Sequence, residues 1–120
     1  MSWIFLGALG AALGVIAGAF GAHALAARLE PRELQLWETA ARYLMYSSFS
    51  LLLLGLFAAQ GARRGTEAAG WCLLAGGAIF SGTVFALALG GPRFLGAVTP
   101  LGGLLMIAGL LIFAWSAVRG

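Results

Sequence analysis

Four stretches of this chain are long enough and apolar enough to cross a lipid bilayer, and this constrains the fold more than any other feature. They run over about 3–22, 40–59, 68–89 and 100–118. A helix needs about 20 apolar residues to cross ~30 Å of hydrocarbon. Because lipid cannot satisfy backbone polar groups, such segments fold as helices. The sequence therefore predicts an all-α integral membrane protein: a compact bundle of four transmembrane helices with short loops.

The charge content supports a membrane location. Of 120 residues, 62% are hydrophobic and 9% are charged, against roughly 25% charged in soluble proteins. The basic residues are all arginines, and they flank the spans rather than cluster on one face, so we expect no nucleic-acid partner. The single cysteine, Cys72, excludes an intramolecular disulfide. We expect one domain over 1–120.

Prolines and arginines set the expected boundaries and orientation. Glu30-Pro31 opens a helix, so an interfacial helical segment over about 31–39 precedes the second span. Thr99-Pro100 is a suitable N-cap and first residue for the fourth helix, which leaves 94–98 in the membrane interface. An even number of spans puts both termini on one side. The Arg63-Arg64 pair on that side favours cytoplasmic termini.

Glycines mark the surface expected to pack against another helix. In the first span they fall on one helical face: Gly7, Gly10, Gly14, Gly18 and Gly21. Small residues let membrane helices approach closely, and van der Waals contact then holds them together. The expected partners in the third and fourth spans are Gly77, Ser81, Gly102 and Gly109. The alternative is a seam between copies in a homo-oligomer.

The second span carries the candidate polar site. An ionisable residue inside a span is by default a functional candidate. The candidate residues are His23, Glu38, Thr39, Arg42, Tyr43 and Tyr46. Glu38 and Arg42 are four residues apart, so they could instead pair and anchor the helix at the membrane boundary. His23, the only histidine, could likewise be an interfacial hydrogen-bonding residue.

Four motifs resemble the uncharacterised YgdD-like family of small membrane proteins: "GAFGAHAL" (18–25), "LWETAARYLMY" (36–46), "FSGTVFALAL" (80–89) and "GAVTPLGGLLMIAGLL" (96–111). The resemblance implies a four-helix protein of the bacterial inner (plasma) membrane and brings no established activity. The pattern emphasises the following residues: Gly21, His23, Glu38, Thr39, Ala40, Tyr43, Ser81, Gly82, Thr99, Pro100, Gly102 and Gly103. Such proteins commonly read Tyr-Gln-Met-Tyr-His where this chain has Leu44 and Ser47 as the second and fifth residues, which weakens a shared metal or proton-transfer function.

Three functions follow from these residues, and the first is favoured. It is a non-enzymatic bundle that binds membrane lipid or a membrane-protein partner, because no carboxylate, histidine or lysine lies at mid-depth in any span. The second is a small transporter or channel subunit that uses the polar face of the second span. The third is a membrane enzyme with His23 and Glu38 as its acid–base pair. We expect no catalytic constellation, no metal and no cofactor.

Overall fold

The computed structural model describes residues 2–61 and 63–119, and in these ranges it contains helices and loops but no strand. Its elements, in chain order, are α1 (Trp3–Phe20), the π-helical turn η1 (Gly21–Leu25), α2 (Pro31–Ala58), α3 (Thr66–Ala88) and α4 (Leu95–Arg119). α1 with η1, α2, α3 and α4 are each long and apolar enough to cross a membrane. The prediction of an all-α membrane protein with four transmembrane helices is confirmed.

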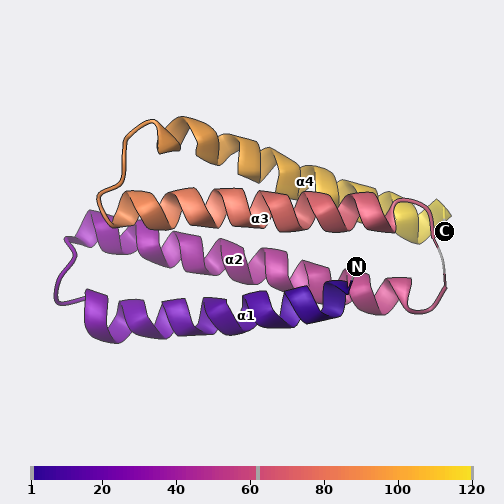
Figure 1. The fold of residues 1–120 in the computed structure, drawn as a ribbon, viewed down its shortest axis with the longest axis horizontal. Coiled ribbons are helices and arrows are strands. Elements are labelled where there is room, and N and C mark those ends of the chain that lie inside the picture. Colours follow the sequence, from indigo (N-terminus) through magenta and orange to yellow (C-terminus); the bar gives the residue numbers. More distant parts are fainter. Residues whose placement is uncertain (1, 62, 120) are drawn as a thin grey trace.

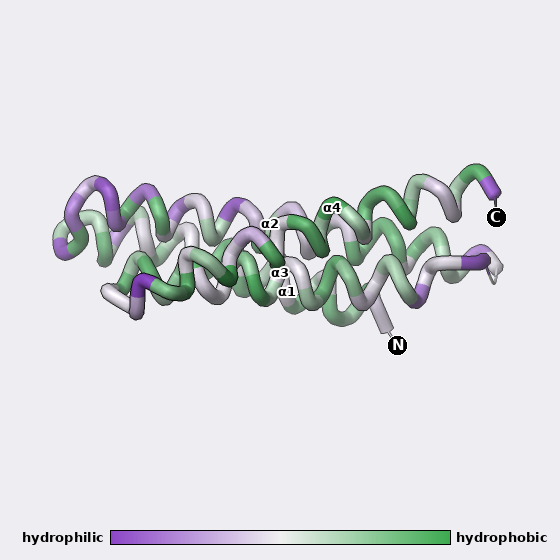
Figure 2. Tube along the Cα trace, turned by 90° about the horizontal axis from the view of Figure 1, so that it is seen from above, coloured by the Kyte–Doolittle hydropathy of each residue, from purple (hydrophilic) through white to green (hydrophobic). Residues whose placement is uncertain are grey.

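The helices form a row in chain order (Figure 1). α1 packs on α2, α2 on α3 and α3 on α4, while α2 and α4 touch only slightly. The molecule accordingly measures 48 × 27 × 19 Å. The α1–α2 and α3–α4 loops lie at one end of the molecule's long axis, which runs along the helices, and the α2–α3 loop lies at the other end. Hydrophilic residues concentrate toward these ends and recur along α2 (Figure 2).

The start of α2 is fixed by its N-cap residue, Glu30, and by the first three helical residues. Pro31 is the first helical residue, where its missing N–H is not needed. Glu30 and Glu33 form a reciprocal capping box, in which the Glu30 N–H donates to Glu33 Oε1 at 3.2 Å. α2 then continues for 28 residues, about 42 Å at the α-helical rise. This exceeds the ~30 Å hydrocarbon layer, so its first turns reach the headgroup region.

The start of α4 differs from the expected Thr99-Pro100 cap. α4 begins at Leu95, so Pro100 lies inside the helix and 95–98 form its first turn. Thr99 Oγ1 donates to the Leu95 carbonyl at 2.9 Å and lies 2.6 Å from Thr83 Oγ1 in α3. Proline is tolerated within membrane helices where neighbouring helices and Thr side chains offset the lost backbone bond. The local signal read as a helix start is therefore overridden by packing on α3.

The glycine stripe of α1 packs on α2, whereas the sequence suggested partners in α3 and α4. A Cβ atom at Gly7 would lie 2.7 Å from the Leu52 nitrogen and the Ser48 oxygen, so only glycine fits there. Gly10, Gly14 and Gly21 also face side chains of α2. Gly18 is exposed, with open space where a Cβ would lie. The short α1–α2 connection makes α2 the neighbour that the stripe meets first.

The other predicted small residues lie at the α2–α3 and α3–α4 interfaces. Gly77 faces the Ser47 side chain, and Ser81 Oγ donates to the Ala40 carbonyl at 2.9 Å. A Cβ atom at Gly102 would lie 2.5 Å from the Phe80 nitrogen. A Cβ at Gly109 would lie 2.8 Å from Leu73 Cγ, so both glycines of α4 pack on α3. An apolar core cluster comprises Trp3, Leu51, Leu54, Ala69 and Leu73.

Candidate functional site

His23 lies on η1, and its side chain is exposed. Within residues 2–61 and 63–119, no hydrogen bond or ion pair joins it to Glu38, which is also exposed. The same ranges contain no group of three His, Cys, Asp or Glu side chains that could hold a metal ion. The structure therefore does not bring the two candidate acid–base groups together.

Trp37 of α2 holds the junction of α1 and η1. Its indole Nε1 donates to the Ala17 carbonyl at 2.7 Å. Its ring lies 4.5 Å from the Phe85 ring and 6.1 Å from the Phe20 ring, measured between centroids. A Cβ at Gly21 would lie 2.6 Å from Trp37 Cδ1, so glycine admits the indole. π-helical turns are rare and recur at functional sites. This contact was not predicted from the sequence, because nothing local links Trp37 to Ala17.

The polar residues of α2 lie along the surface of the helix. Arg42 is exposed and contacts Thr39 Oγ1 at 3.5 Å. Among the described residues, no ion pair joins Arg42 to Glu38. Tyr43 stacks on Phe80 of α3 with ring centroids 4.6 Å apart, and Tyr46 is 50% exposed. The candidate polar site is therefore an open helix face that begins near the loops.

Several serine hydroxyl groups donate hydrogen bonds to backbone carbonyls. Ser47 Oγ donates to the Leu73 carbonyl at 2.7 Å, and Ser50 Oγ donates to the Tyr46 carbonyl at 2.7 Å. Ser116 Oγ donates to the Arg64 carbonyl. In the part of the chain that the structure describes, no buried side-chain nitrogen or oxygen lacks a hydrogen-bond partner. The Ser47 and Ser116 bonds link separate segments of the chain, whereas the Ser50 bond lies within α2.

A lateral groove runs between α1 and α3 over α2. Its two hollows, of about 360 and 180 Å³, share Leu13 and Leu44 and so adjoin each other. The larger hollow is lined by Leu13, Ile16, Ala17, Phe20, Trp37, Leu44 and Phe85. The smaller is lined mainly by leucine and small residues of the same three helices. We call the two together the lateral groove; it offers almost only apolar surface.

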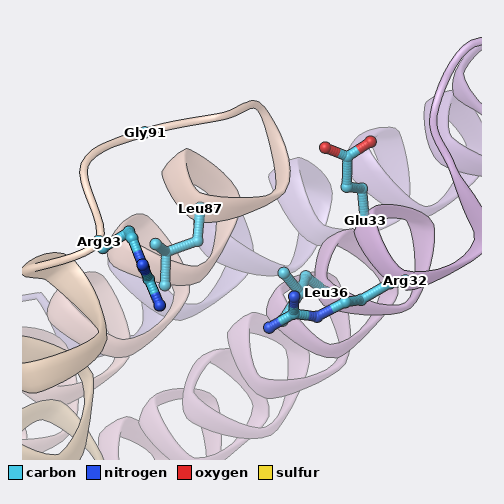
Figure 3. A pocket seen from close by; sticks show the side chains of 6 residues that line it. All are labelled: Arg32, Glu33, Leu36, Leu87, Gly91 and Arg93. Carbon is cyan, nitrogen blue, oxygen red and sulfur yellow. The ribbon is translucent and has the colours of Figure 1, made fainter.

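A separate hollow lies at the end of the molecule where α2 begins (Figure 3). It measures about 370 Å³ and is lined by Arg32, Glu33, Leu36, Leu87, Gly91 and Arg93. We call it the arginine pocket. Its two arginines come from the first turn of α2 and from the α3–α4 loop, so only the fold shows that they line one hollow.

The four apolar helices and their small-residue interfaces define a small integral membrane protein. Residues 17–103 match a family model described as a protein of unknown function (DUF423). A UPF0382 membrane protein of Staphylococcus epidermidis is 41% identical over 98% of this chain and 95% of its own. The UPF0382 membrane protein YwdK of Bacillus subtilis is 37% identical over 98% of this chain and 96% of its own. The chain therefore belongs to this family of bacterial membrane proteins, which confirms the resemblance to a small uncharacterised membrane family. No solved structure matches the chain.

Proposed function

We propose that this protein is a non-enzymatic membrane protein whose lateral groove binds the acyl chain of a membrane lipid. The observation that carries the proposal is the groove itself, formed by three helices and lined almost entirely by apolar side chains. Apolar concave surfaces are the usual binding sites for apolar ligands. In a membrane, the ligand of that chemistry at highest concentration is lipid.

The arrangement of polar groups supports this function over transport or catalysis. A transporter normally carries polar or ionisable groups along its substrate path. Here the deep hydroxyls are bonded to backbone carbonyls, and Tyr43 is stacked on Phe80. An acid–base pair needs mutual geometry, and His23 and Glu38 are both exposed without a mutual hydrogen bond.

Filling the lateral groove is expected to reduce lipid retention several-fold. Ala17 and Ala78 line its two hollows, so the double variant Ala17→Leu/Ala78→Leu places extra side-chain volume where the acyl chain would lie. Native mass spectrometry after extraction in mild detergent counts the lipid that stays bound to each chain. Ala114→Leu, on an exposed position of α4, adds the same side chain outside the groove and is the matched control. Equal retention in the groove variant and the control contradicts the proposal.

We also propose that the protein lies in the inner (plasma) membrane with both termini in the cytoplasm. The Arg63-Arg64 pair, in the loop at the same end as the start of α1 and the end of α4, supports this orientation. A fluorescent protein that matures only in the cytoplasm, fused after Gly120, is expected to be bright. A dark fusion combined with an active alkaline phosphatase fusion at the same position would place the termini outside.

A further inference from the structure

The arginine pocket brings two cations from distant parts of the chain to one apolar floor. Arg32 is the second residue of α2, and Arg93 lies in the turn that precedes α4. Figure 3 shows their side chains on two sides of the hollow, with Leu36 and Leu87 between them. The pocket therefore combines guanidinium donors at its rim with a hydrocarbon surface beneath them.

Glu33, which also lines the pocket, caps the start of α2 and, within the described chain, forms no ion pair with either arginine. Glu33 Oε1 accepts the Glu30 N–H, and the Glu30 side chain accepts a backbone N–H of the first turn. Figure 3 shows the Glu33 carboxylate turned away from both guanidinium groups. Within residues 2–61 and 63–119, neither Arg32 nor Arg93 forms an ion pair. Two arginines and one carboxylate thus line the same cavity, and neither arginine is paired with that carboxylate.

The position of the pocket indicates the kind of anion that it fits. α2 is longer than the hydrocarbon layer, so its first turns lie at headgroup level, where Leu36 lines the pocket. The amino end of a long helix also favours negative charge. Guanidinium groups bind phosphate through paired, charge-assisted hydrogen bonds. An anion with an attached hydrocarbon chain matches both the rim and the floor.

We propose that the arginine pocket binds the headgroup phosphate of an acidic phospholipid. Arg32 and Arg93 contact the phosphate, and Leu36 and Leu87 contact the first part of an acyl chain. The pocket shares no lining residue with the lateral groove, so this proposal goes beyond the proposed function and does not depend on it. It adds headgroup recognition to a protein whose lateral groove is apolar.

The test compares lipid preference in nanodiscs of phosphatidylcholine with and without phosphatidylglycerol. The full chain is extracted in mild detergent, and native mass spectrometry measures phosphatidylglycerol retained relative to phosphatidylcholine. We expect enrichment of phosphatidylglycerol with the unmodified protein. Arg32→Gln/Arg93→Gln is expected to lower this preference by about tenfold or more, because the loss of even one charge-assisted contact has about that effect. Arg64→Gln/Arg119→Gln removes the same charge at the opposite end and is expected to keep it.

Further arms separate the possible failures. If inorganic phosphate displaces the retained lipid as efficiently as a soluble acidic lipid does, the pocket is a site for a free anion and the proposal is overturned. Equal enrichment in the two arginine double variants also overturns it. Because all four substituted arginines are exposed, both arginine double variants should show unchanged thermal unfolding. Ala17→Leu/Ala78→Leu is expected to keep the headgroup preference, so failure of the lateral groove and failure of this pocket give different results.

Discussion

Gly102→Ala is expected to weaken the packing of α4 on α3 by about 1–3 kcal/mol, the usual cost of overpacking a close contact. A Cβ atom at this position would lie 2.5 Å from the Phe80 nitrogen and 2.9 Å from the Gly76 oxygen. Both are backbone atoms, so no side-chain rotation can relieve the clash. The helices must separate, and membrane helices depend on close van der Waals contact for their association.

The neighbouring glycine provides the matched control. At Gly103 the nearest atom to an added Cβ is Phe80 Cδ2 at 3.7 Å, an ordinary contact distance. Gly103→Ala makes the same chemical change in the same helix and gains helix propensity of up to about 1 kcal/mol. Unfolding by sodium dodecyl sulfate, followed by circular dichroism, gives the free energy of each variant. Equal stabilities for Gly102→Ala and Gly103→Ala contradict the packing of α3 on α4 described above.

Trp37→Phe is expected to destabilise the protein by about 0.6–1.7 kcal/mol, from the average to the maximum measured for hydrogen bonds between membrane helices. The variant keeps an aromatic ring between Phe20 and Phe85 but removes the N–H that donates to the Ala17 carbonyl. Because that carbonyl also accepts the backbone N–H of Gly21, the first residue of η1, the loss should be local as well as global. We expect faster amide hydrogen exchange over 21–25.

Trp71→Phe serves as the control for this change. Trp71 is 49% exposed and meets the edge of Trp3 with ring centroids 5.5 Å apart, at the opposite end of the α1–α2 pair. It is expected to leave exchange over 21–25 unchanged. If Trp37→Phe exchanges at the wild-type rate in this segment, η1 does not depend on the indole.

Much of the fold could be predicted because bilayer thickness imposes a length on every apolar span. The four spans and the all-α class follow from that length and from the scarcity of charge. The start of α4 could not be predicted, because Thr99-Pro100 is a valid local cap and only the contact with Thr83 makes the helix continuous. Similarly, the stripe from Gly7 to Gly21 indicated close packing but did not identify α2 as its partner, since glycine carries no partner-specific side chain.

The candidate site was less predictable than the fold. The polar face of α2 was visible as a spacing of residues, yet spacing cannot show that His23 and Glu38 stay apart in space. The arginine pocket was missed because Arg32 and Arg93 are 61 positions apart in the chain. The lateral groove was missed because its walls are ordinary leucines and alanines, which are conspicuous only once α1 and α3 are placed on either side of α2.

The measurement that tests the proposed function most directly is an experimental structure of the full chain in lipid nanodiscs. Our account predicts elongated acyl-chain density in the lateral groove, between Leu13 of α1 and Phe85 of α3, with Trp37 beneath it. A helix of a second copy seated in that groove would contradict lipid binding there. So would an empty groove accompanied by a file of ordered water along the polar face of α2, which would favour transport instead.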